Sequence, residues 1–271
     1  MLGTRRASPS AENVAAARAH LTRRGILDDI YAERFARRSK RVAFDLLASL
    51  PGPAQALSWI AARTKFYDQL AIDCLDAGIR QVVIVGAGYD ARAWRFARDD
   101  VRFVEVDHSA TQERKKALAP PGGPEFVAAD LSVQRLADVL APCLTLGEPV
   151  LITCEGLTPY LTEPAVRSFL SQAAELCPAG SRLGVEFGTK AVAAAPLRLR
   201  WVPVVMRVLQ RWSGEPLQLE LQQEDVPALL HDTGWSSAEV FTSADLHARF
   251  LRASDLPLPS PDGGVWSATK T

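Results

Sequence analysis

The sequence predicts an α/β fold built on a mostly parallel sheet of about seven strands. Three observations support this prediction. Along the first 77 residues, apolar side chains recur every three or four positions, as they do in helices. At Gln81 the pattern changes to QVVIV, a β-branched run that is typical of a buried strand. From there to residue 190, short apolar runs alternate with helical stretches at the spacing of βαβ units.

The N-terminal part is expected to be a helical cap that packs on the sheet. A first helical stretch fills most of the first 50 residues and is expected to stop at Pro51-Gly52-Pro53. A second runs from about Ala54 to Ala77. We expect one domain in four parts: the cap (1–77), a core (78–190), an inserted lid (191–222) and the last part of the sheet (223–271).

The remaining elements follow from the same patterns. Five strands are expected to end near Val85, Asp107, Asp130, Glu155 and Phe187. Helices are expected at Thr111–Leu118, Val133–Leu140, Glu163–Leu176 and near Glu224–His231. Two late strands, near Ala238–Thr242 and Gly264–Thr269, have no long crossover between them, which favours an antiparallel edge. Residues 191–212 carry four arginines and no acid, which suits either a lid above the substrate or a solvated outer helix.

Composition excludes several classes of protein. With 31 basic and 31 acidic residues, the net charge of zero gives no reason to expect nucleic acid or an anionic membrane as a partner. The basic run at 37–41 is interpreted as a solvated helix face, and no apolar run approaches the roughly 18 residues of a membrane span. No export signal is recognisable, so we expect a cytoplasmic protein. The four cysteines form no CxxC pair, which predicts buried free thiols and neither a metal site nor disulfides.

The segment VVIVGAGYDAR carries the strongest chemical signal. A buried strand runs into Gly86-Ala87-Gly88, where glycines allow a tight turn and a close approach of the backbone to a ligand. Its spacing also satisfies the dinucleotide fingerprint G-x-G-x-x-G/A. We therefore expect Gly86 and Gly88 to lie beside a nucleotide-like ligand.

Acids follow the next strands at the same edge of the sheet. Asp107 lies at the end of the second strand, where a carboxylate can bind both hydroxyls of a ribose, and it is favoured over Glu105 two residues earlier. NAD and S-adenosylmethionine both contain such a ribose. Asp130-Leu131 ends the third strand, where an acid and an apolar side chain suit an adenine ring; this pair favours S-adenosylmethionine. Glu155 and Tyr160 follow the fourth strand.

These segments resemble a known family. RTKFYD at 63–68, GAGYDAR, EVD, DL and EGLTPYL occur in this order, and with their surroundings they look like the leucine carboxyl methyltransferase family, in particular its bacterial S-adenosylmethionine-dependent O-methyltransferases. The likeness spans about residues 10–250 and is strongest over 60–190. It implies a class I methyltransferase (Rossmann-like) fold with S-adenosyl-L-methionine as cofactor.

The resemblance also implies roles for individual residues. Arg63 matches the arginine that meets the carboxylate of the methionine moiety, and Glu155 matches the glutamate at the same amino-acid end. Tyr160 matches a position that faces the substrate carboxylate; Arg63 and Tyr160 are the candidate catalytic residues. The cofactor-binding set is then Arg63, Gly86, Gly88, Asp107, Asp130, Leu131 and Glu155, with no metal. Pro159 before the tyrosine departs from the family pattern, so the resemblance does not name the substrate.

The expected reaction is methyl transfer to the carboxylate of a small metabolite, for which a secondary-metabolite acid is the suggested class. A carboxylate is ionised at pH 7 and attacks a methyl sulfonium without a base. Three alternatives stay open: a phenol or hydroxyl acceptor with His108 as base, an NAD-dependent dehydrogenase, and a non-catalytic cofactor-binding protein. We expect no nucleic-acid or membrane partner, and a homodimer is one option for the assembly.

Overall fold

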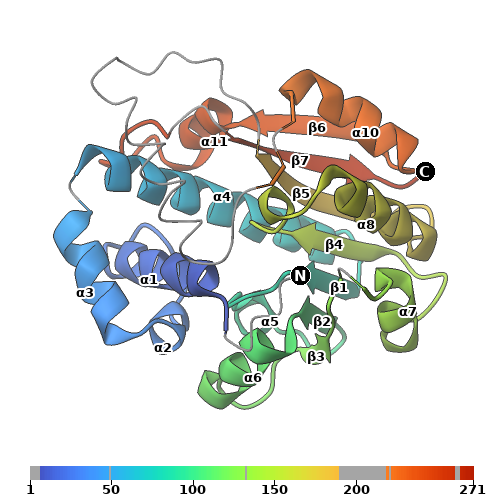
Figure 1. Ribbon diagram of the computed structural model, residues 1–271, viewed down its shortest axis with the longest axis horizontal. Helices are drawn as coiled ribbons and strands as arrows, with labels where there is room; N and C mark the ends of the chain where they lie inside the picture. The colour runs from blue at the N-terminus through green and yellow to red at the C-terminus, as the bar shows by residue number, and fades with distance from the viewer. Residues whose placement is uncertain (1–6, 49, 132, 189–217, 220, 260–262) are drawn as a thin grey trace.

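A seven-stranded sheet of order β3-β2-β1-β4-β5-β7-β6 organises the protein (Figure 1). The structure, a computed structural model, describes residues 7–48, 50–131, 133–188, 218–219, 221–259 and 263–271. The strands are β1 (Gln81–Val85), β2 (Arg102–Asp107), β3 (Glu125–Ala128), β4 (Val150–Cys154), β5 (Arg182–Gly188), β6 (Ser236–Thr242) and β7 (Gly263–Thr269). This confirms the predicted α/β class.

The direction of each strand follows from its connection and composition. β1 to β5 pair in parallel, and every residue of the central strands β1 and β4 is buried, as expected for apolar strands covered on both faces. β7 lies antiparallel between β5 and β6, which confirms the predicted antiparallel edge. The carboxyl ends of the parallel strands therefore share one edge of the sheet, where ligands bind in such folds.

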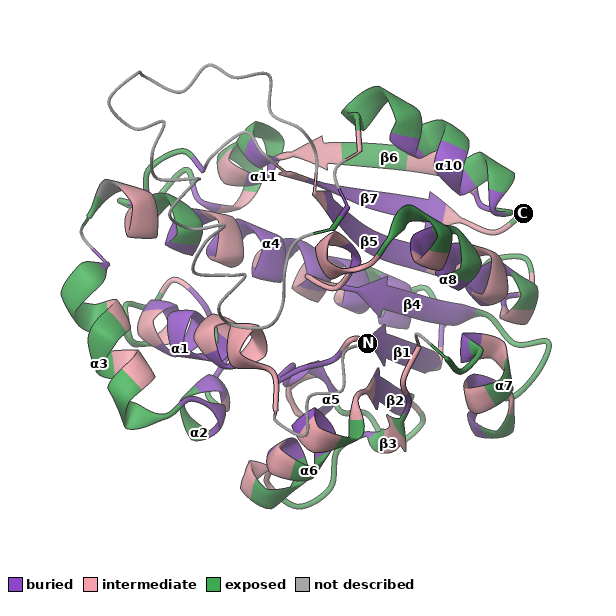
Figure 2. Cartoon of the chain, viewed as in Figure 1, coloured by how far each residue is buried: buried purple, intermediate pink, exposed green. Residues whose placement is uncertain are grey.

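Helices cover both faces of the sheet. They are α1 (Pro9–Arg23), α2 (Ala32–Phe35), α3 (Arg38–Leu47), α4 (Pro51–Asp76), α5 (Arg92–Arg95), α6 (Ser109–Leu118), α7 (Leu136–Leu140), α8 (Glu163–Leu176), α10 (Val226–Asp232) and α11 (Ser243–Phe250), with 3₁₀ turns η1 (Ala141–Cys143), η2 (Thr158–Tyr160) and η4 (Gln223–Asp225). One apolar core joins α7, α8 and α10 to the sheet, and a second joins α1, α4 and α11 to its other face. Figure 2 shows the strands β1, β4, β5 and β7 largely buried, whereas the edge strands β3 and β6 and the outer surfaces of the helices are partly exposed.

Two predicted boundaries were wrong. Pro51-Gly52-Pro53 does not separate the helices but begins α4. Proline is tolerated there because the N–H groups of a first helical turn have no partner within the helix. The helix expected at Val133–Leu140 begins only at Leu136, after a turn in which the N–H groups of Val133 and Gln134 bind the carbonyl of Asp130.

Other expectations concern the surface and the thiols. No residue of α3, which begins within the basic run at 37–41, is buried. The four cysteines are buried free thiols, as predicted. Within the described parts of the chain, no helix is both long enough and apolar enough to cross a bilayer. Most of the expected lid, residues 191–217 and 220, lies outside the described residues.

Candidate functional site

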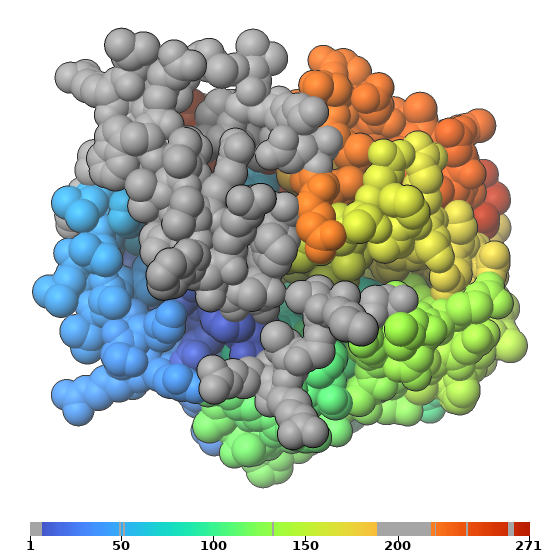
Figure 3. Space-filling view, in the orientation of Figure 1, coloured from blue at the N-terminus to red at the C-terminus, as the bar shows by residue number. Residues whose placement is uncertain are grey.

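A cavity of about 720 Å³ opens at the carboxyl ends of β1 to β4 and has the size of a small-molecule site. It lies between helix α1 of the cap and helix α8, which stand on opposite sides of the face shown in Figure 3. All eight residues selected from the sequence line it: Arg63, Gly86, Gly88, Asp107, Asp130, Leu131, Glu155 and Tyr160. The structure therefore brings together residues that come from five separate segments of the chain.

The glycine turn after β1 forms the floor of this cavity. Gly86 has φ +66°, and its N–H donates to the carbonyl of Val106 at 2.8 Å, which holds the turn against β2. A Cβ atom on Gly86 would lie 2.9 Å from the side chain of Leu157, and one on Gly88 would lie 3.0 Å from the Cβ of Ala11 in α1. The turn is thus closed from both sides, which explains why glycine occupies positions 86 and 88.

Asp107 ends β2 at the rim of the turn. Its carboxylate accepts hydrogen bonds from the backbone N–H groups of Gly88 and of His108, the latter at 2.6 Å. Burial raises its pKa, and these N–H donors oppose the increase. Glu105, two residues earlier, does not line the cavity; it is completely buried and pairs with Lys115 of α6.

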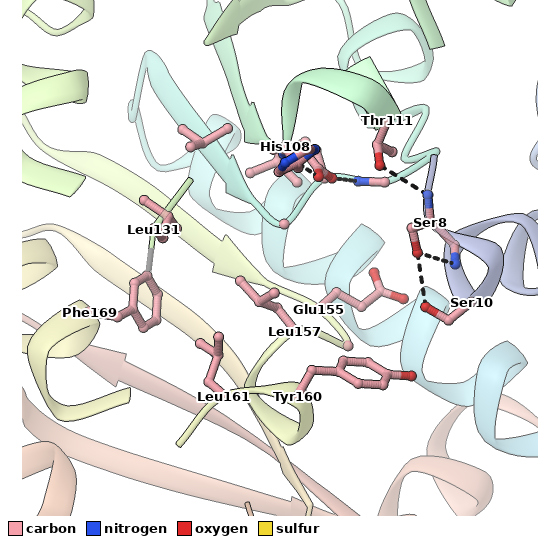
Figure 4. Close-up of a pocket in the computed structure, with 18 of the residues that line it drawn as sticks. Ser8, Ser10, His108, Thr111, Leu131, Glu155, Leu157, Tyr160, Leu161 and Phe169 are labelled. Atoms are coloured by element: carbon pink, nitrogen blue, oxygen red, sulfur yellow. Dashed lines mark hydrogen bonds between the residues drawn. The ribbon is translucent and has the colours of Figure 1, made fainter. Parts of the chain in front are cut away.

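Asp130 and Leu131 follow β3 at the far end of the cavity. Both are half-buried, and the backbone N–H of Asp130 donates to the side-chain oxygen of Gln134 at 2.9 Å. Leu131 lies close to Phe169 of α8 in Figure 4, with Leu157 and Leu161 nearby. This end combines an acid with an apolar wall, as the adenine hypothesis requires.

Glu155 lies between two arginines. Its Oε1 accepts from Arg63 Nε at 3.0 Å, and its Oε2 accepts from Arg92 Nη1 at 2.7 Å. Burial would raise the pKa of Glu155, but Arg92, Arg63 and Arg18 together lower it to about 2. The group is therefore a fixed anion over the whole range in which proteins are stable.

Arg63 reaches the cavity from α4 and is itself fixed. Besides Glu155, its Nη1 donates to both oxygens of Glu186 in β5, each at 2.9 Å. Burial would lower its pKa, but the charges of Glu186 and Glu155 outweigh burial and raise it. Trp59 also donates to Glu186, at 3.1 Å, so the acid holds two groups of α4.

Tyr160 and His108 lie on opposite sides of the cavity (Figure 4). Tyr160 ends the turn η2, where its backbone N–H donates to the carbonyl of Leu157 at 3.0 Å, and its ring lies near Glu155. His108 is the N-cap of α6, where its Nδ1 accepts from the N–H of Ala110 at 3.3 Å. This explains the histidine as a structural cap near the Asp107 end.

Several residues that line or support the cavity were not found by sequence reasoning. Arg92 is the last residue of the quoted GAGYDAR motif, and Glu186 lies near the end of a predicted strand. The available signals were a second charged residue in the motif and a single acid in an otherwise apolar strand end. The contribution of α1 had no such signal. Its residues Ser8, Ser10, Ala11, Val14 and Arg18 form one wall, and the N–H of Ser8 donates to Thr111 of α6 at 3.2 Å.

Comparison with known proteins agrees with this geometry. The family model described as leucine carboxyl methyltransferase matches residues 11–174, which contain every predicted site residue. The chain belongs to the leucine carboxyl methyltransferase family. The match includes both the cap helices that wall the cavity and the strands whose ends form its floor.

Relatives and solved structures extend the match to the whole chain. A protein of Mycobacterium marinum assigned as an S-adenosyl-L-methionine-dependent methyltransferase is 31% identical over 94% of this chain and 90% of its own length. A relative from Mycobacterium avium with the same assignment is 30% identical over 91% of this chain and 88% of its own length. A structure from Thermobifida fusca assigned as a methyltransferase has TM-score 0.62 at 16% identity, covering 100% of this chain and 97% of that one.

The class I methyltransferase fold and the cofactor S-adenosyl-L-methionine are thereby confirmed, and the alternative of an NAD-dependent dehydrogenase is rejected. The cavity fits such a cofactor, because the backbone of the glycine turn lines it directly and because acids predominate around it. Asp90, Asp107, Asp130, Glu155 and Glu186 line the cavity beside only two described arginines, Arg18 and Arg63. A cofactor with a sulfonium and an ammonium group carries the complementary charge.

The predicted role of Asp107 as a ligand of the ribose can be tested with the variant Asp107→Ala. We expect it to weaken binding of S-adenosylhomocysteine by roughly 2–4 kcal/mol, because two ribose hydroxyls would lose a charged partner. Asp107→Asn keeps one acceptor oxygen and should lose less. Isothermal calorimetry measures both, and unchanged affinity in folded Asp107→Ala would exclude the ribose assignment.

Proposed function

We propose that the protein transfers the methyl group of S-adenosylmethionine to an oxygen atom, and that this oxygen belongs to the carboxylate of a small metabolite. The observation that carries the proposal is that no group on the described wall near Tyr160 is available as a general base. An acceptor that is already ionised needs none.

The charged groups of this wall are committed to one another. A carboxylate with a pKa of about 2, like that of Glu155, is too weak a base to deprotonate a phenol. Glu186 binds Arg63 and Trp59. His108 caps α6 on the other side of the cavity from Tyr160. These contacts support an acceptor that arrives without its proton.

The proposed arrangement of the cofactor follows the polarity of the cavity. The adenine lies at Asp130-Leu131 and the ribose at Asp107, while the amino-acid end lies at Arg63 and Glu155. The transferable methyl group then points toward Tyr160. Arg63 keeps its Nη2, which neither Glu155 nor Glu186 engages in the bonds described above, for the carboxylate of the methionine moiety.

In this arrangement the chain acts by orientation and by exclusion of water. A carboxylate oxygen attacks the methyl carbon in line with the breaking carbon–sulfur bond, so that the sulfonium becomes a neutral thioether and the acid becomes a methyl ester. Alignment of the reacting atoms is the main source of acceleration for such a step. Tyr160 donates a hydrogen bond that holds the acceptor carboxylate in place.

The product of the reaction tests this proposal directly. The protein is incubated with methyl-labelled S-adenosylmethionine and a panel of aliphatic and aromatic acids and of phenols. We expect labelled products that release methanol under mild alkali, as esters do. An alkali-stable labelled product would identify an aryl ether and a phenol acceptor instead.

The variants Tyr160→Phe and His108→Ala separate the same alternatives. Tyr160→Phe keeps the ring but removes one hydrogen bond to a charged group. We expect kcat/KM to fall by a factor that corresponds to about 1.5–3 kcal/mol of lost transition-state stabilisation. His108→Ala should cost little. A phenol acceptor requires the reverse order, because deprotonation assisted by a base contributes roughly 10²–10⁴-fold. Steady-state kinetics with the acceptor found above decides between them.

A further inference from the structure

Arg92 is the most heavily bonded charged side chain beneath the cavity, yet it does not line the cavity itself. It belongs to the short helix α5 and is 2% exposed. Its guanidinium binds three carboxylates and one carbonyl: Asp68 at 2.8 Å, Asp90, Glu155 at 2.7 Å and the oxygen of Thr64 at 3.2 Å. Each partner comes from a segment that forms the site.

Two of these partners belong to the RT-x-x-x-D motif of α4. Arg63 is the first residue of this motif, the Thr64 carbonyl follows it directly, and Asp68 is its last residue. Arg92 therefore binds α4 over more than one turn, directly after the position of Arg63. Its third contact reaches Glu155 beyond β4.

The result is an alternating row of charges, Arg92–Glu155–Arg63–Glu186, that runs under the amino-acid end of the cavity. Each carboxylate oxygen of Glu155 accepts a hydrogen bond from a different arginine, so the carboxylate cannot rotate without losing one of these bonds. Both inner members line the cavity. A row of this kind holds binding groups to a few tenths of an ångström, which a site needs from its supporting residues.

We propose that Arg92 is a positioning residue for the amino-acid end of S-adenosylmethionine, acting through Glu155 and through the turn of α4 that carries Arg63. The inference depends on the cofactor placement given under the proposed function. It extends that placement to a side chain that does not touch the cofactor. The planar fork of arginine suits the task, because a lysine ammonium presents one point charge and cannot span Asp68 and Glu155 together.

The test compares two ligands on one variant, Arg92→Gln. S-adenosylhomocysteine has the amino-acid end, whereas 5′-methylthioadenosine keeps the adenine, ribose and sulfur but lacks it. We expect Arg92→Gln to weaken the binding of S-adenosylhomocysteine by roughly 10- to 100-fold, which is the effect of losing one or two hydrogen bonds between charged groups. Binding of 5′-methylthioadenosine should stay within about twofold, because Asp107 and Asp130 remain in place.

Arg95→Gln is the matched control. Arg95 is in the same helix and binds the same Asp68, at 2.6 Å, but it makes no hydrogen bond to Glu155 and does not line the cavity. It should leave the affinity for both ligands unchanged. Circular dichroism and thermal melting establish that each variant is folded before calorimetry.

The outcomes distinguish this inference from the placement on which it depends. If the unmodified protein binds the two ligands equally well, the placement at Arg63 and Glu155 is wrong. If it prefers S-adenosylhomocysteine but Arg92→Gln loses affinity equally for both ligands, or for neither, the positioning role is wrong and the placement stands. Should Arg92→Gln not fold, Arg92→Lys takes its place, with a smaller loss expected for S-adenosylhomocysteine alone.

Discussion

Gly86→Val is expected to abolish binding of S-adenosylhomocysteine while most of the fold remains. The backbone at this position has φ +66°, which a β-branched residue adopts only with strain, and the new Cβ atom would lie 2.9 Å from Leu157. Either response, a shifted turn or a displaced Leu157, would place atoms in the space proposed for the cofactor. Calorimetry should detect no binding, and circular dichroism should show a nearly native spectrum.

Gly25→Val separates strain from obstruction. Gly25 has nearly the same backbone conformation, φ +70°, but a Cβ atom there would meet nothing within 4 Å, and it does not line the cavity. We expect this variant to lose some thermal stability and to bind the ligand normally. A folded Gly86→Val protein with affinity within about threefold of the original would falsify the assignment of the glycine turn to the cofactor.

Lys115→Met is expected to lower the free energy of unfolding by about 3–5 kcal/mol at pH 8. The Nζ of Lys115 lies 2.5 Å from Glu105, and both side chains are completely buried. Their pairing compensates for the removal of two charges from water, so that loss of one partner leaves an uncompensated buried charge. Urea unfolding at pH 8 measures the difference.

The loss should depend on pH. Burial raises the pKa of Glu105 from its ordinary value of 4.5 to about 7 even with Lys115 beside it, and removal of the lysine raises it further. A carboxyl group whose pKa is higher in the folded state favours folding when protonated, so stability falls as pH rises from about 4.5 through 7. The deficit of Lys115→Met should therefore be smaller at pH 5 than at pH 8.

A double variant provides the control. Glu105→Gln combined with Lys115→Met removes both charges and should recover most of the lost stability, since neutral groups of similar volume often replace a buried pair at little cost. If the deficit of Lys115→Met is the same at pH 5 and pH 8, Glu105 does not titrate as described. If the double variant is as unstable as the single one, packing rather than charge explains the loss.

Much of the fold could be predicted because its signals are local. The β-branched run at Gln81–Val85 and the apolar run at Val150–Cys154 are buried on both faces, and such strands are visible in the sequence alone. Helix boundaries were less certain, since the first turn of α4 accepts Pro51, which elsewhere would end a helix. The register of the antiparallel edge could not be predicted, because it depends on pairing between residues that lie 75 to 87 positions apart in the chain.

By itself the sequence determined which residues meet at the cavity floor. In a parallel sheet, all carboxyl ends lie at one edge, so acids that follow consecutive strands, such as Asp107, Asp130 and Glu155, must converge there. Only the tertiary structure decided how they are used. It separated Asp107 in the cavity from Glu105 in the core, brought α1 against the glycine turn, and placed Glu155 between Arg63 and Arg92. These contacts join residues far apart in the chain, and burial and ion pairing depend on the complete packed fold, which no local pattern records.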